Sequence, residues 1–549
     1  MGERVRVFSV NKAIGAASSG VEYAQHYRRG LLAGIDWVDD RYVFTDYIGT
    51  NLCVYTDRLG FERSRVTWIY DLVTGRETRP CVLRADDVLA AIPQEHEPLR
   101  ETLGVPGCVE VALTGSPLRH RIRTVEDGLV DRVETLAGER LLRVEHYTDA
   151  LHSVEHFAAG RAVRREFFTA DGRLAAEQWL RDGEIARTRI TAASPLYDPA
   201  LPRRRGRPLR AGGELLLEGR SAFLRFVFAQ LFDRDDDVVI VDRPLDVIDA
   251  VAPVIGDRRL YSVVHAEHYD LKRIEDGVLL WNNHYEHVFS RPDLVDGLIV
   301  STERQRGILE RQLARAHRER RAADRRLHVG DEAAYRPSRV SAIPVGFAAA
   351  REPAAHHDPL ALVTASRLAA EKHLDTLIRA VAEARRELPG LRLDIYGEGR
   401  RDPLLAAIGE TDSGSYVRLM GHRPLAGVLG AYGLYVTAST SEGFGLSLLE
   451  AIAEGLPVVG FDVDYGNREM VESGVNGLLV PCGFRDGGMS ERDVSALAAG
   501  IAEVLGAEAA SSGAYERMRA ASLRRAADFG EERVRERWAA LLGASGGGR

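Results

Sequence analysis

Lysine is almost absent from this chain of 549 residues. It occurs only at Lys12, Lys272 and Lys372, so the other 70 of the 73 basic side chains are arginines. Arginine therefore serves wherever a cation alone is needed, and each lysine raises the question of why a compact ammonium group is kept there. Acidic residues outnumber basic ones by 81 to 73, which gives a net charge of −8. This balance argues against a protein whose main task is to bind nucleic acid.

Cysteine is also rare, and long apolar runs are missing. The four cysteines, Cys53, Cys81, Cys108 and Cys482, lack the paired spacing and the neighbouring histidines of a zinc site. We therefore expect separate buried thiols and no disulfide framework. No apolar run approaches the ~18 residues that a membrane-spanning helix needs. The opening residues MGERVRVFSVNKAIG lack the long apolar stretch and cleavage site of a secretory signal, so we expect a cytoplasmic protein.

The composition is that of a folded protein with several domains. Hydrophobic residues make up 45% and charged residues 28%, and a chain of this length corresponds to roughly three or four domains. The first segments follow the order of an open α/β domain: a strand at residues 5–10, a small-residue loop at 14–20 and a helix from about residue 21. Further short strands are predicted at 42–45 and 66–70.

From about residue 76 the pattern changes to an alternation of apolar and polar residues. Residues 141–147 and 162–168 are examples, and such alternation is typical of antiparallel strands with one solvated face. Turn signals separate the strands at Asp127-Gly128, Asp171-Gly172 and Asp182-Gly183. A basic, proline-bounded run at 202–208 ends this region, and we interpret it as a solvated linker.

After this linker the α/β pattern resumes and continues through the rest of the chain. Strands are predicted at 238–241, 260–264, 297–300, 361–366, 391–396, 417–420, 434–437 and 457–460. The predicted fold is two Rossmann-like domains facing a cleft, with an antiparallel β-sheet inserted in the N-terminal domain. The predicted boundaries are 1–75 and 206–345 for the N-terminal domain, 76–205 for the insertion, 346–530 for the C-terminal domain and 531–549 for a helix with a flexible tail.

The densest functional signal is the segment SEGFGLSLLE at 441–450. A strand is predicted to end just before it, and a helix to begin at about Leu446. Backbone N–H groups at a helix start attract anions, and the glycines allow a diphosphate to come close. Glu442 and Glu450 could then hold the sugar and ribose hydroxyls of a nucleotide-sugar. A lone glutamate would merely favour a helix start, but the complete segment indicates a binding site.

Two cations lie in a second candidate segment, SRLAAEKH at 366–373. It follows the first predicted strand of the C-terminal domain, where ligands of α/β sheets bind. Arg367 and Lys372 could neutralise the charge that develops on a departing diphosphate. An ordinary solvated loop is the simpler interpretation, but the retention of a lysine in so arginine-rich a chain weighs against it.

The spacing of Glu442 and Glu450 resembles the Glu-x7-Glu motif of the retaining family-4 glycosyltransferases, which have the GT-B fold. A narrower resemblance is to the accessory Sec system glycosyltransferases, in their catalytic subunit. It rests on the segments 14–15, 17–25, 44–46, 59–61, 264–269 and 281–283. The resemblance spans the whole chain, including the alternating region, which in that family forms an add-on sheet used for the acceptor and the partner subunit.

The resemblance implies an activity and partners. It implies a hexosyltransferase that moves N-acetylglucosamine from UDP-N-acetylglucosamine to Ser/Thr hydroxyls of a serine-rich adhesin in the cytoplasm, without a cofactor or metal. The implied protein is the catalytic subunit of a complex with a paralogous, non-catalytic, stabilising subunit. The resemblance also leaves room for a peripheral contact with the inner face of the cell membrane, and it gives no role to nucleic acid.

The resemblance also implies roles for single residues. In the N-terminal domain, the donor phosphates or the acceptor would be approached by Gly20, Val21, Glu22 and Tyr23, and the donor sugar would contact His265. In the C-terminal domain, the diphosphate would be held by Arg367 and Lys372, and the uracil would lie by His422. The sugar would be bound by Glu442, Gly443, Phe444 and Gly445, and the ribose by Glu450. Arg423 and Leu446 complete the predicted donor site. The predicted catalytic set is His265, Arg367, Lys372 and Glu442.

No residue stands out as an enzymatic nucleophile. Retention then suggests front-face attack, in which the donor's own phosphate takes the acceptor proton and the protein supplies positioning and electrostatic stabilisation. His265 and His268 have a spacing that could also suggest a metal site, but no third ligand is apparent.

Two alternative functions remain open at this point. A transferase of the same architecture that adds N-acetylglucosamine to teichoic acid, a poly-polyol-phosphate, would suit the basic segments. A non-catalytic subunit that binds glycoprotein would be expected to have lost parts of the donor site, whereas Arg367, Lys372, Glu442 and Glu450 are all present.

Overall fold

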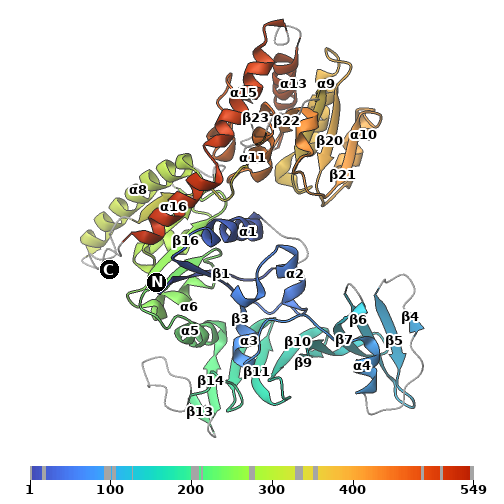
Figure 1. Cartoon of the computed structure of the whole chain (residues 1–549), viewed down its shortest axis with the longest axis vertical. Coiled ribbons are helices and arrows are strands. Elements are labelled where there is room, and N and C mark those ends of the chain that lie inside the picture. The colour runs from blue at the N-terminus through green and yellow to red at the C-terminus, as the bar shows by residue number, and fades with distance from the viewer. Residues whose placement is uncertain are drawn as a thin grey trace. The chain divides into compact units, whose positions relative to one another are not determined.

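The computed structural model describes residues 3–14, 20–91, 100–101, 107–125, 128–198, 209–211, 214–270, 279–327, 338–349, 351, 357–483, 488–506 and 511–544. Four predicted features lie wholly or partly outside these residues: positions 15–19 of the loop at 14–20, Asp127 of a predicted turn, the linker at 202–208 and positions 545–549 of the C-terminal tail. The chain divides into two compact units, Met1–Arg29 with Asp36–Tyr261, and Gly30–Ile35 with Ser262–Gly546 (Figure 1).

Strand β1 (Val5–Asn11) lies in a parallel sheet, paired to β2 (Val38–Phe44) on one side and to β15 (Val238–Val241) on the other. Its seven strands run in the order β18-β17-β16-β15-β1-β2-β3, with β3 at Val66–Trp68, β16 at Arg259–Val264, β17 at Gly297–Val300 and β18 at Arg339–Ala342. All four residues of β15 and of β17 are buried, as expected for parallel strands covered on both faces. The prediction of one strand over 66–70 is wrong at its end, because Ile69 begins a helix.

The helices of the first unit are α1 (Gly20–Ala33), α2 (Leu52–Arg58), α3 (Ile69–Thr74), α4 (Ala85–Ala90), α5 (Gly219–Leu231) and α6 (Ile248–Ile255). Asn51 caps α2, since its side-chain oxygen accepts a hydrogen bond from the Cys53 N–H at 3.0 Å. Cys53, Cys81 and Cys108 are buried and Cys482 is half-buried, as expected for separate thiols with at most partial access to solvent.

The alternating region forms an antiparallel sheet of eleven strands. They are β4 (Arg100–Glu101), β5 (Cys108–Ala112), β6 (Leu118–Thr124), β7 (Val130–Ala137), β8 (Arg140–Tyr147), β9 (Leu151–Ala158), β10 (Arg161–Phe168), β11 (Leu174–Arg181), β12 (Glu184–Ile190), β13 (Leu209–Ala211) and β14 (Glu214–Glu218). Their order is β13-β14-β12-β11-β10-β9-β8-β7-β6-β5-β4. Phe167 of β10 stacks on Tyr70 of α3 with ring centroids 4.7 Å apart, so this sheet shares a core with the helices of its own unit.

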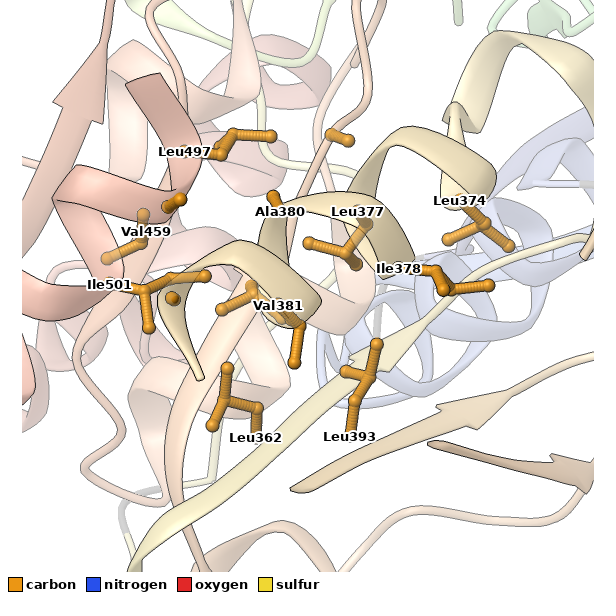
Figure 2. Close-up of a cluster of buried hydrophobic side chains, with 14 of the residues drawn as sticks. Leu362, Leu374, Leu377, Ile378, Ala380, Val381, Leu393, Val459, Leu497 and Ile501 are labelled. Atoms are coloured by element: carbon orange, nitrogen blue, oxygen red, sulfur yellow. The ribbon is translucent and has the colours of Figure 1, made fainter. Parts of the chain in front are cut away.

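The second unit contains a parallel sheet of six strands: β19 (Asp358–Ala365), β20 (Arg392–Tyr396), β21 (Val417–Gly421), β22 (Tyr432–Thr437), β23 (Val458–Phe461) and β24 (Gly477–Val480). Its helices are α7 (Glu286–Ser290), α8 (Glu303–Leu327), α9 (Leu374–Ala384), α10 (Asp402–Glu410), α11 (Leu446–Ala453), α12 (Gly466–Met470), α13 (Glu491–Leu505), α15 (Ala514–Ala527) and α16 (Glu531–Gly543). Figure 2 shows how Val381 of α9 points toward Leu362 of β19, with Leu377 of α9 and Ile501 of α13 in the same buried cluster.

The six strands run in the order β21-β20-β19-β22-β23-β24. Chain order therefore reverses between β19 and β22, which is the Rossmann arrangement, and ligands bind beyond the carboxyl ends of the strands at such a reversal. Two parallel sheets with helices and one antiparallel add-on sheet confirm the predicted GT-B fold class. Among the described residues, no helix is both long and apolar enough to cross a membrane.

Candidate functional site

The loop at 438–445 joins β22 to α11 at the reversal point of the six-stranded sheet. The predicted order of strand, glycine turn and helix is confirmed, with α11 beginning at Leu446. Gly445 has a φ of 87°, a conformation that glycine adopts without strain. At Gly443 a side chain is impossible without movement, because a Cβ atom would lie 2.5 Å from the carbonyl oxygen of His265. The glycines are therefore required by the path of the loop.

An ion pair joins the two candidate segments of this unit. The Lys372 Nζ donates to Glu442 Oε2 at 2.6 Å and lies 3.3 Å from the hydroxyl of Ser439. Lys372 follows β19 and Glu442 follows β22, and because these strands are neighbours their carboxyl ends lie side by side. The lysine and glutamate side chains are 15% and 23% exposed, so the pair is largely shielded but still reaches solvent. One compact ammonium group thus donates to two oxygens from a single point, which the broader guanidinium of arginine would not reproduce.

His265 lies on the loop after β16, in the same unit as Glu442. The backbone N–H groups of His265 and Ala266 donate to the hydroxyl of Tyr285 at 3.1 and 3.2 Å. The His265 carbonyl meets the backbone of Gly443, as described above. The structure thus brings together three members of the predicted catalytic set, His265, Lys372 and Glu442.

Tyr465 and Gly466 support this arrangement from the loop after β23. Their backbone N–H groups donate to the Glu442 carbonyl oxygen at 3.2 and 2.9 Å. A side chain at Gly466 would meet the Phe444 carbonyl oxygen at 2.1 Å, so the two loops are packed backbone to backbone. Tyr285 and Tyr465 are absent from the predicted site, because they belong to no recognisable motif.

Comparison with known proteins identifies the family. The family model "Glycosyl transferases group 1" matches residues 359–506, which contain both candidate segments. A Streptococcus pneumoniae protein named "UDP-N-acetylglucosamine--peptide N-acetylglucosaminyltransferase GtfA subunit" is 33% identical over 539 residues, covering 97% of this chain and 98% of the relative. The chain belongs to the GtfA subunit family. The Streptococcus gordonii protein of the same name is 34% identical over 485 residues, covering 86% of this chain and 87% of that protein.

Solved structures agree with this assignment to the GtfA family. The crystal structure of the pneumococcal O-GlcNAc transferase GtfA in complex with UDP and GlcNAc has a TM-score of 0.83 at 31% identity and covers 99% of both chains. A structure described as a GtfA/B complex has a TM-score of 0.80 at 31% identity, covering 98% of this chain and 99% of that one. TarM, at 16% identity and a TM-score of 0.73, shares the fold over 98% of this chain and 99% of its own.

Arg367 is the fourth member of the predicted catalytic set. It follows β19 with its side chain 67% exposed, and it donates to Glu371 at 3.0 Å. An exposed pair of this kind holds an arginine only weakly, so the guanidinium can move to a ligand. Its predicted contact with a diphosphate stays a prediction.

The remaining donor-site residues of this unit lie on two further elements. His422 and Arg423 are exposed directly after β21, and Arg423 donates to the Tyr396 hydroxyl at 2.7 Å with its guanidinium 4.8 Å from the ring centre. Phe444 is buried, whereas Leu446 and Glu450 on α11 are half-buried. Their predicted contacts with a nucleotide-sugar stay predictions.

Gly20–Tyr23 belong to the first unit, where they form the first turn of α1. The helix predicted from about residue 21 is confirmed, and Gly20, predicted as the last residue of the preceding loop, already belongs to it. The Glu22 carboxylate is buried and accepts hydrogen bonds from Arg243 at 3.1 Å and Asn11 at 3.4 Å. A carboxylate held in this way organises the end of β1, and a donor-binding role for these four residues stays a prediction.

The spacing of His265 and His268 is one that two metal ligands could have. Within the described ranges, no group of three or more His, Cys, Asp and Glu side chains could hold a metal ion. His268 instead contacts the Gln312 side chain and the Tyr465 hydroxyl.

Proposed function

We propose that this protein transfers N-acetylglucosamine from UDP-N-acetylglucosamine to Ser/Thr hydroxyls of a serine-rich protein, with retention of the anomeric configuration. The observation that carries the proposal is the Lys372–Glu442 ion pair in a chain that matches the GtfA subunits along almost its full length. The names of these relatives supply the donor and the peptide acceptor. The serine-rich nature of the acceptor follows from the sequence resemblance.

The proposed reaction is a displacement at the anomeric carbon. The acceptor oxygen forms a bond to that carbon, the bond from the carbon to the diphosphate oxygen breaks, and the hydroxyl proton passes to the departing phosphate. An ammonium group carries three hydrogens, and the contacts of Lys372 with Glu442 and Ser439 account for two of them. The third is available to a phosphate oxygen, where positive charge stabilises the leaving group.

The other residues of the site bind and orient the donor in this proposal. Glu442 holds a sugar hydroxyl while paired with Lys372, Arg367 swings to the diphosphate, and Glu450 holds the ribose. His265 contacts the sugar from the loop that meets Gly443. We assign general-base chemistry to neither glutamate and expect no metal ion or other cofactor, because the two cations can balance the diphosphate charge.

We also propose that the chain is the catalytic subunit of a hetero-oligomer with a paralogous stabilising subunit. The GtfA/B complex among its structural relatives supports this arrangement. The add-on sheet ends in two edge strands, β13 and β4. Edge strands present unpaired backbone groups to a partner or to an extended acceptor. We place the complex in the cytoplasm, with a peripheral contact at the inner face of the membrane, because the resembled family works there.

The two alternatives have less support. TarM resembles this chain in fold alone, so it gives no argument for a polyol-phosphate acceptor. A non-catalytic glycoprotein-binding subunit would have no need for the paired Lys372 and Glu442 in a shielded loop.

A donor screen tests the proposal. Purified protein, alone and with its partner subunit, is incubated with UDP-N-acetylglucosamine, UDP-glucose or UDP-galactose and a serine-rich peptide, and release of UDP is measured. We expect release above background with UDP-N-acetylglucosamine and a further increase with the peptide. If UDP were released from none of the three donors, the proposal would be contradicted.

A further inference from the structure

His268 is a fully buried histidine three residues after His265. Its ring stacks against Tyr465, with centroids 5.5 Å apart, and lies near Trp281 and Phe289. Both of its nitrogens have partners in this apolar enclosure. Nε2 lies 2.7 Å from Oε1 of Gln312, and Nδ1 lies 3.0 Å from the hydroxyl of Tyr465.

These contacts fix the tautomer of His268. The amide oxygen of Gln312 can only accept, so Nε2 must carry the hydrogen, which leaves Nδ1 as the acceptor of a neutral ring. The Tyr465 hydroxyl therefore donates to Nδ1. The Gln305 side-chain N–H group also approaches Nδ1, at 3.5 Å, while donating to the Ala266 carbonyl at 2.9 Å. Burial lowers the pKa of His268 to about 4, in agreement with a neutral ring.

The ring of His268 stands between the two loops that carry His265 and Glu442. On one side His268 belongs to the His265 loop, which Gln305 also holds through Ala266. On the other side it accepts from Tyr465, whose backbone N–H donates to the Glu442 carbonyl at 3.2 Å. One neutral imidazole therefore links the two loops through the Tyr465 hydroxyl, which the neighbouring Tyr269 side chain also contacts.

We propose that His268 is a positioning residue of the transfer reaction. Its Nδ1 accepts the hydrogen bond that holds Tyr465 in place, and Tyr465 in turn holds the Glu442 loop in position beside His265. His268 touches neither donor nor acceptor. The inference rests on the proposed function, because the geometry that it controls is that of the donor-sugar contacts. UDP lacks the transferred N-acetylglucosamine, so UDP binding should depend little on the hydrogen bond between His268 and Tyr465. Turnover of the complete donor should depend on it strongly.

Two substitutions of His268 separate its two hydrogen bonds. An asparagine side chain places its amide near the position of Nδ1, so His268→Asn can still accept from Tyr465 but loses Gln312. A glutamine side chain reaches the position of Nε2, so His268→Gln can still donate to Gln312 but loses Tyr465. Tyr465→Phe removes the hydroxyl and with it both the His268 contact and the contact with Tyr269. As a matched control, Tyr515→Phe removes another buried tyrosine hydroxyl, which donates to the Gly433 carbonyl at 2.8 Å.

The experiment measures kcat and KM for donor turnover, UDP affinity by calorimetry, and the melting temperature of all four variants. We expect kcat to fall about 10-fold in His268→Gln and in Tyr465→Phe, the effect of one hydrogen bond lost from a positioned group. His268→Asn and Tyr515→Phe should keep kcat within about 3-fold of the wild type, and UDP affinity should be unchanged in all four.

Some outcomes would overturn the inference. Wild-type kcat in His268→Gln or Tyr465→Phe would show that the link does not position the site. If His268→Asn and His268→Gln lost kcat equally, and if each loss followed the decrease in melting temperature of that variant, His268 would have a structural role only. Failure of the proposed function is distinguishable, because the wild-type protein itself would then neither bind UDP nor turn over the donor.

Discussion

Substitutions of Lys372 should change the rate of turnover much more than the stability of the fold. Its ammonium nitrogen serves Glu442 Oε2 at 2.6 Å and the Ser439 hydroxyl at 3.3 Å from a single point. In Lys372→Arg the planar, broader guanidinium cannot reproduce both contacts and also reach a phosphate oxygen. Lys372→Ala removes the charge altogether. Both changes should therefore reduce turnover, and Lys372→Ala should reduce it more.

The expected magnitudes follow from the surroundings of the pair. Loss of one well-placed electrostatic contact to a transition state typically lowers the rate about 10²–10³-fold, or ~2.7–4 kcal/mol. The effect on folding should stay below the about 3–5 kcal/mol that removal of one partner costs in a fully buried pair, because the Lys372 and Glu442 side chains are 15% and 23% exposed and water can reach the group that is left. UDP affinity should fall less than turnover, since the contact strengthens as charge accumulates on the leaving group.

The assay measures donor turnover beside thermal unfolding for Lys372→Arg and Lys372→Ala. Arg379→Ala is the control, because Arg379 on α9 also pairs with carboxylates, those of Glu410 at 2.7 Å and Asp375 at 3.2 Å, on a partly exposed helix face. We expect wild-type turnover in that variant. Wild-type turnover in Lys372→Arg would refute the reasoning and return Lys372 to the role of a loop cation.

UDP should bind with unchanged affinity in EDTA, because arginine and lysine balance its charge, and calorimetry that lost the binding signal with chelator would contradict this. Gly443→Ala should lower turnover at least about 10-fold, since its Cβ would lie 2.5 Å from the His265 carbonyl. Gly409→Ala on α10, where an added Cβ meets no atom within 4 Å, should leave turnover unchanged. Burial lowers the pKa of His268 to about 4, so the unfolded chain takes up the proton first. Stability should therefore fall as the pH drops from about 6.5 to about 4. That pH dependence should be weaker in His268→Asn, and thermal melts that show the same slope for both proteins would argue against it.

Much of the fold could be predicted from local sequence patterns. The apolar run at 297–300 coincides with β17, because a buried parallel strand is a short apolar segment between turn signals. Ile69 and Tyr70 were predicted as the end of a strand because they continue a strand-like run, yet they begin α3, where the Tyr70 ring stacks on Phe167 of the add-on sheet. The short strand β24 (Gly477–Val480) was not predicted at all.

The candidate site was predictable in its parts and not in its contacts. Glu442 and Lys372 could each be selected from a motif or from the scarcity of lysine, but they are 70 positions apart. They meet because β19 and β22 are neighbours at the reversal of strand order. The roles of His268 and Tyr465 depend on side chains from separate loops that meet only in the folded chain, so no local spacing could indicate them.

The most direct test of the proposed activity is mass spectrometry of a serine-rich peptide incubated with the protein, UDP-N-acetylglucosamine and the partner subunit. The proposal predicts N-acetylhexosamine on Ser or Thr side chains, joined with the anomeric configuration of the donor, and none with Glu442→Gln under the same conditions. An unmodified peptide together with labelled polyol-phosphate polymer in a parallel reaction, or a product of inverted configuration, would contradict it.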